Sequence, residues 1–83
     1  MEIHEKAKRT ARVIVSDIVL YNKSKIEEGL SKGNLKELLK EEIDRGRELY
    51  HSKLPPEVIE STDYFNQILI QTVAKGNRSI LGL

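Results

Sequence analysis

The segment Ala11–Asn22, ARVIVSDIVLYN, constrains the fold of this chain more than any other. Its β-branched residues favour a strand, but Ser16 and Asp17 interrupt the apolar alternation on both faces that a strand would have. A helix is the better fit, because a helical apolar stripe runs through the segment and begins before it. We therefore predict a helix over residues 3–21, held by burial because β-branched residues lower helix propensity. The stripe consists of Ala7, Ala11, Ile14, Ile18 and Tyr21.

The same helix carries more apolar residues than one neighbour can cover. Val13 and Leu20 lie outside the stripe, and Val15 and Val19 widen one side of it. The apolar arc is therefore wider than the usual arc of about 100°. Such a helix is either central, touching two neighbours, or it meets another subunit. We expect it to be enclosed on several sides, and we predict a self-association contact made by Val13, Val15, Val19 and Leu20.

Turn and breaker signals divide the rest of the chain. Gly33-Asn34 is a strong turn signal, and Pro55-Pro56 ends the helix that precedes it. Gly46 interrupts an apolar stripe, and we expect it to allow the close approach of another helix. Short connections favour antiparallel neighbours, so we predict an all-α bundle. Its elements are three main helices, residues 3–21, 34–53 and 62–75, joined by shorter helical pieces near 24–31 and 56–60.

Length and composition point to one small intracellular domain. The 83 residues predict a single helical domain, 1–83, with an ordered core of about 3–76 and a tail at 77–83. The chain has no cysteine, a charged amino terminus and no apolar run of about 18 residues. We therefore expect a cytoplasmic protein with no membrane segment. A chain this short buries only about 60% of its unfolded surface, so pairing with a second copy, as a homodimer, would add stability.

The residue types that carry chemistry are few and scattered. His4 and His51 have no second ligand at a metal-site spacing, and we expect both to be solvated. The five glycines form no phosphate-binding loop, and Ser16-Asp17 has no histidine nearby in sequence. We therefore predict no catalytic residue, no metal, no cofactor and no enzymatic activity.

The net charge of +1 is unevenly distributed. Lys6, Arg9 and Arg12 share one face of the first helix, with Lys8 on its margin, and such a face can contact phosphates. However, Glu5 lies among them and is spaced to pair with Arg9. No aromatic residue is interleaved for base stacking. Nucleic-acid binding through Lys6, Arg9 and Arg12 is therefore the alternative to a protein-interaction module, and it is the less favoured of the two.

Five segments together resemble a known helical module: HEKAKRTARVIVSDIVLYN, EEG, LKEEIDRGRELY, PPEV and DYF. The module is found at the carboxyl end of bacterial proteins, often after a zinc ribbon of the paired-CxxC type or a receiver domain. The match spans roughly residues 4–76. The resemblance implies an accessory domain of a bacterial regulatory or surface-associated protein and assigns no site residues. This chain has no cysteines, so it is either an excised module or a free-standing version.

Overall fold

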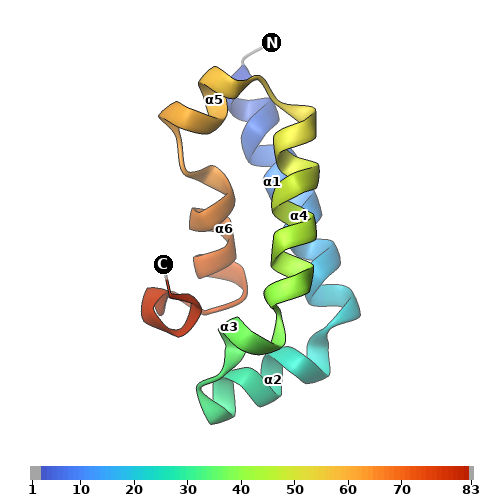
Figure 1. The fold of residues 1–83 in the computed structure, drawn as a ribbon, viewed down its shortest axis with the longest axis vertical. Coiled ribbons are helices and arrows are strands. Elements are labelled where there is room, and N and C mark those ends of the chain that lie inside the picture. The colour runs from blue at the N-terminus through green and yellow to red at the C-terminus, as the bar shows by residue number, and fades with distance from the viewer. Residues whose placement is uncertain (1–2, 83) are drawn as a thin grey trace.

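The computed structural model describes residues 3–82, which form helices and no strand (Figure 1). The predicted all-α fold is therefore confirmed, as an elongated bundle of 40 × 22 × 17 Å. The elements are α1 (Ile3–Tyr21), α2 (Lys23–Lys32), α3 (Leu35–Leu38), α4 (Lys40–Lys53), α5 (Pro56–Ser61), α6 (Tyr64–Thr72) and the 3-10 helix η1 (Arg78–Leu81).

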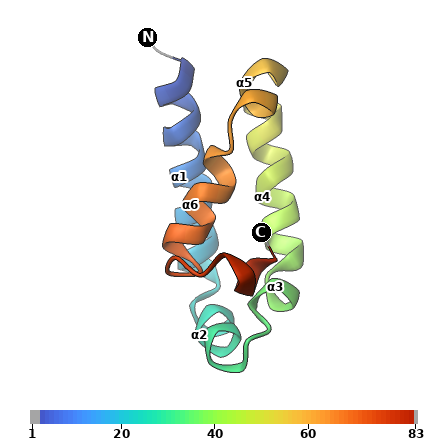
Figure 2. The ribbon, with the colours of Figure 1, turned by 90° about the vertical axis from the view of Figure 1, so that its left-hand side faces the viewer.

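Helix α1 is the centre of the bundle. It packs most extensively against α6 and α4, running antiparallel to α4 and parallel to α6 (Figures 1 and 2). Helix α5 lies at one end of the long axis, and α2 and α3 lie at the other. This packing agrees with the first of the two alternatives predicted for the helix, a central position between two neighbours. The α1 residues buried in the core are Ala7, Ala11, Ile14, Val15 and Ile18.

Two expectations for α1 are wrong. Tyr21, predicted to lie on the core stripe, is 80% exposed, because α1 ends there and the chain turns at Asn22. The Asn22 side-chain amide donates to the Ile18 carbonyl at 2.8 Å and so covers a free end of the helix. We also expected α1 to be enclosed on several sides. Within one chain it is not, because Val13 and Leu20 are each 57% exposed. Helices α4 and α6 cover the other side of α1.

Gly46 on α4 sets the distance between α4 and α1. A Cβ atom at this position would lie 3.0 Å from Cγ2 of Ile14 and 3.1 Å from Cδ1 of Ile18. It would also lie 3.3 Å from Cζ of Phe65 on α6. Gly46 is buried, so any side chain here would push against two helices at once. The close approach predicted for Gly46 is confirmed.

The helix predicted over 34–53 is divided into two. Helix α3 ends at Leu38 and α4 begins at Lys40, with Leu39 between them at φ −103° and ψ 7°. The break lets α3 pack on α2 while α4 packs on α1. At the α2 contact, a Cβ on Gly29 would lie 2.6 Å from Cα of Leu35. Leu35 and Leu39 are both fully buried, so tertiary packing produces the bend, without a proline or glycine at that point.

The end of the chain takes part in the core. Helix α6 is shorter than the predicted 62–75, and Gly76 follows it at φ +92°, its N–H donating to the Ile70 carbonyl at 2.8 Å. Element η1 then packs against α3 and buries Leu81. The core therefore includes part of the segment 77–83 that the sequence separates as a tail.

Candidate functional site

The solvent-facing side of α1 is the candidate site. The helical repeat of 100° per residue places it opposite the buried stripe. Val13 and Leu20, seven residues apart, project from this side two turns from each other. We call this surface the α1 outer face. Its members are all exposed: Lys6, Arg9, Val13, Ser16, Asp17 and Leu20.

The structure separates the four residues predicted for self-association. Val13 and Leu20 lie together on the α1 outer face, but Val15 is completely buried in the core and Val19 is half-buried against it. Val15 cannot touch a second chain without leaving the core, so its inclusion in the contact is corrected. In the sequence pattern Val15 lies at the edge of the apolar stripe. Because α1 packs against both α4 and α6, this edge is buried in the core.

The basic residues of α1 are exposed and available. None of the four ion pairs formed within residues 3–82 involves α1, so the predicted Glu5–Arg9 pair is not formed. Lys6, Arg9 and Arg12 all face solvent. Lys8 behaves differently from these three, because its ammonium lies 5.2 Å from the centroid of the Tyr64 ring, a cation–π contact with α6.

An apolar hollow between α1 and α4 continues the α1 outer face. Ile18 and Gly46 lie in its lining, together with Tyr21 and Leu49. Leu49 is 47% exposed, and Tyr21 is still more open. Asp17 belongs both to the α1 outer face and to the lining of this hollow, so the two surfaces adjoin along α1.

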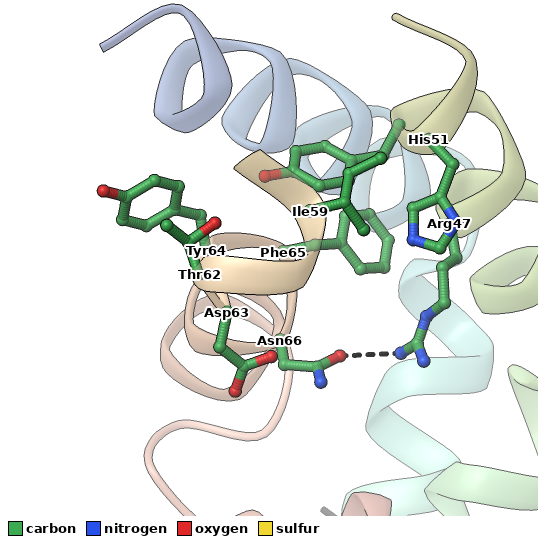
Figure 3. Close-up of a pocket in the computed structure, with 9 residues that line it drawn as sticks. Arg47, His51, Ile59, Thr62, Asp63, Tyr64, Phe65 and Asn66 are labelled. Atoms are coloured by element: carbon green, nitrogen blue, oxygen red, sulfur yellow. Dashed lines mark hydrogen bonds between the residues drawn. The ribbon is translucent and has the colours of Figure 1, made fainter. Parts of the chain in front are cut away.

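A second hollow lies between the end of α4 and the start of α6 (Figure 3). Here the Arg47 guanidinium donates to Oδ1 of Asn66 at 2.7 Å and lies 5.5 Å from the centroid of the Phe65 ring. Arg47 and His51 lie on one side of Phe65, and Asp63 lies on the other (Figure 3). The polar groups of this hollow do not converge on one point, as the groups of a catalytic site would.

Two partly or fully buried polar groups are not revealed by the sequence. His4, expected to be solvated, is half-buried, and its Nδ1 lies 2.9 Å from the Tyr64 hydroxyl. The Tyr50 hydroxyl is buried and has no hydrogen-bond partner in the described part of the chain. Burial raises the pKa of Tyr50 above its ordinary value of 10.0, the nearby Thr62 hydroxyl lowers it in part, and Asp63 raises it further. Both environments are formed by residues far apart in sequence, so no local pattern reveals them.

Comparison of the chain with protein-family models, with curated proteins and with solved structures finds no match. Within residues 3–82, no three His, Asp or Glu side chains are grouped so that they could hold a metal ion. None of the helices in this part of the chain is both long and apolar enough to cross a bilayer.

Proposed function

We propose that the protein is a non-enzymatic interaction module that self-associates through the α1 outer face. The observation that carries the proposal is the exposure of Val13 and Leu20 on a helix whose other side is packed. Covering apolar surface stabilises by about 25 cal/mol per Å². A second copy brings the same two side chains, so each can cover the other in a two-fold contact.

The neighbouring hollow enlarges this contact. A stable pair of proteins buries about 1,200–2,000 Å² of surface in total, which is more than two side chains on each copy supply. Tyr21 and Leu49 extend the apolar surface from α1 towards α4. Tyrosine is enriched at interfaces because its ring is apolar and its hydroxyl can remain hydrated. We therefore include both residues at the edge of the proposed contact.

We further propose that the module works as an accessory domain in the bacterial cytoplasm. The resemblance of residues 4–76 to a bacterial helical module supports a role as an accessory domain of a bacterial regulatory protein. The absence of cysteine from the sequence supports a reducing, cytoplasmic compartment. The partner in this proposal is a second copy of the chain, and homodimerisation is its measurable consequence.

Light scattering at tens of micromolar tests the self-association. We expect twice the chain mass of 9.5 kDa for the wild-type protein and the single mass for Leu20→Glu and for Val13→Glu. Ser31→Glu, at an exposed position of α2, is the control and should remain dimeric. Circular dichroism should show the same helix content in all four proteins. A wild-type protein that remains monomeric at this concentration contradicts the proposal.

Nucleic-acid binding is the second candidate, supported by the exposed Lys6, Arg9 and Arg12, which make no ion pair within residues 3–82. If it is correct, a gel shift with DNA or RNA at low salt should show retention. Replacement of all three residues by alanine should abolish it, and the affinity should fall steeply with salt concentration. The absence of any retention at low salt would exclude this candidate.

A further inference from the structure

We infer that the two copies pair with their α1 helices antiparallel, because the order of charges along the α1 outer face selects that orientation. This inference rests on the proposed self-association and adds its geometry. The amino-terminal half of the face carries Lys6 and Arg9, with Arg12 and a single acid, Glu5, beside them, whereas the carboxyl-terminal half carries Asp17 and no base. All five side chains are exposed, and within residues 3–82 none makes an ion pair that would neutralise it.

A parallel pair would place each charge beside its own copy. Packed helices lie about 8–10 Å apart, which is close to the screening length of about 8 Å at physiological ionic strength. The three basic residues would then face three basic residues. These encounters are repulsive, so the parallel orientation is opposed along the amino-terminal half of the face.

An antiparallel pair separates the basic segments and pairs the apolar residues. With the two-fold axis between Ser16 and Asp17, Val13 lies opposite the partner's Leu20, and Leu20 lies opposite the partner's Val13. Ser16 is small, so the helices can approach closely at the axis. The two basic segments then lie at opposite ends of the contact, and Arg12 lies about 6 Å along the helix axis from the partner's Asp17. Asp17 is close to the partner's Asp17 in both orientations, so the basic segments alone select the orientation.

The absence of cysteine makes the orientation directly measurable. A single spin label can be attached at Glu5→Cys, an exposed position in the first turn of α1. In the antiparallel dimer the two labels are about 35 Å apart, since 23 helical residues at 1.5 Å separate them. In a parallel dimer they are separated by little more than the interhelical distance of about 10 Å. Pulsed electron spin resonance distinguishes these distances.

The variant Arg9→Gln provides an independent test. In a parallel pair it removes the repulsion between Arg9 and the partner's Arg9, and it would tighten the dimer roughly two- to fivefold, most strongly at low salt. In the antiparallel pair the two Arg9 residues are about 22 Å apart along the helix axis, since 15 residues at 1.5 Å separate them, and the dissociation constant should change little. Lys53→Gln, an exposed base at the end of α4, is the matched control and should leave the dissociation constant unchanged in either orientation.

The possible results separate the two proposals. A monomeric wild-type protein overturns self-association and this orientation together. A dimer that Leu20→Glu and Val13→Glu leave intact uses another surface, and it overturns both as well. A dimer dissociated by those variants, but with short label distances or a tighter Arg9→Gln form, overturns the antiparallel orientation alone. Long label distances together with an Arg9→Gln form of unchanged affinity support it.

Discussion

The imidazole Nδ1 of His4 lies 2.9 Å from the hydroxyl oxygen of Tyr64, sixty residues further along the chain. The two rings meet edge to face, with centroids 5.9 Å apart and an interplanar angle of 89°. One turn along α1, the Lys8 ammonium lies over the same tyrosine ring. These contacts hold the first turn of α6, which follows α5, against the first turns of α1.

Tyr64→Phe should lower the free energy of unfolding by about 0.5–1 kcal/mol, because it removes the hydrogen bond to His4 and keeps both ring contacts. Urea denaturation measures the change. Tyr21→Phe makes the same chemical change at an exposed hydroxyl and should have almost no effect. In a double-mutant cycle with His4→Ala, a coupling energy of zero would show that the hydrogen bond contributes nothing.

Tyr50→Phe should leave the free energy of unfolding unchanged or raise it by up to about 1 kcal/mol. Only 3% of Tyr50 is exposed, and its hydroxyl has no hydrogen-bond partner in the described residues. Removing a buried, unsatisfied hydroxyl removes its desolvation cost. Tyr50→Ala should instead cost about 3–5 kcal/mol through loss of the ring. Destabilisation by Tyr50→Phe of more than 1 kcal/mol would reveal a hydrogen bond that this geometry lacks.

Gly46→Ala should lower the free energy of unfolding by about 1 kcal/mol. Alanine gains about 1 kcal/mol of helix propensity over glycine, but overpacking against Ile14, Ile18 and Phe65 costs typically 1–3 kcal/mol. Thermal unfolding measures the balance. Glu48→Ala, on an exposed position of the same helix, should change the stability little. A stabilised Gly46→Ala protein would mean that α1 and α4 can separate at no cost.

The stability should fall in acid partly through Glu42. A hydrogen bond from its own backbone lowers the pKa of Glu42 below the ordinary 4.5, burial partly opposes this, and Lys25, whose Nζ lies 3.1 Å from Oε1, lowers it further. The stabilisation is therefore complete above pH 4.5 and is lost as the pH falls through the lowered pKa.

Denaturant titrations between pH 3 and 7 test the contribution of Glu42. Glu42→Gln should be less stable than the wild type near pH 7, and the difference should shrink below about pH 4.5. Glu48→Gln, an exposed acid of the same helix outside the ion pairs of the described residues, is the matched control. If the Glu42→Gln difference does not change with pH, the carboxylate charge plays no part.

The class of fold and most of its helices follow from the sequence alone. Local signals mark them: the apolar stripe of α1, the turn at Gly33-Asn34 and the break at Pro55-Pro56. The wide apolar arc of α1 left two alternatives open, a central helix or a contact with another subunit. Gly46 could be assigned to a close helix contact because a glycine on an apolar stripe has few other uses.

The edges of the buried arc of α1, and the residues that meet across the bundle, come from the packing of the whole chain. Four features depend on where a distant helix lies: the burial of Val15, the exposure of Tyr21, the bend at Leu39 and the contact between His4 and Tyr64. Residue spacing records the direction of a side chain around its own helix. It does not indicate which residue the side chain will contact, because the contacts are set by the packing of the whole chain.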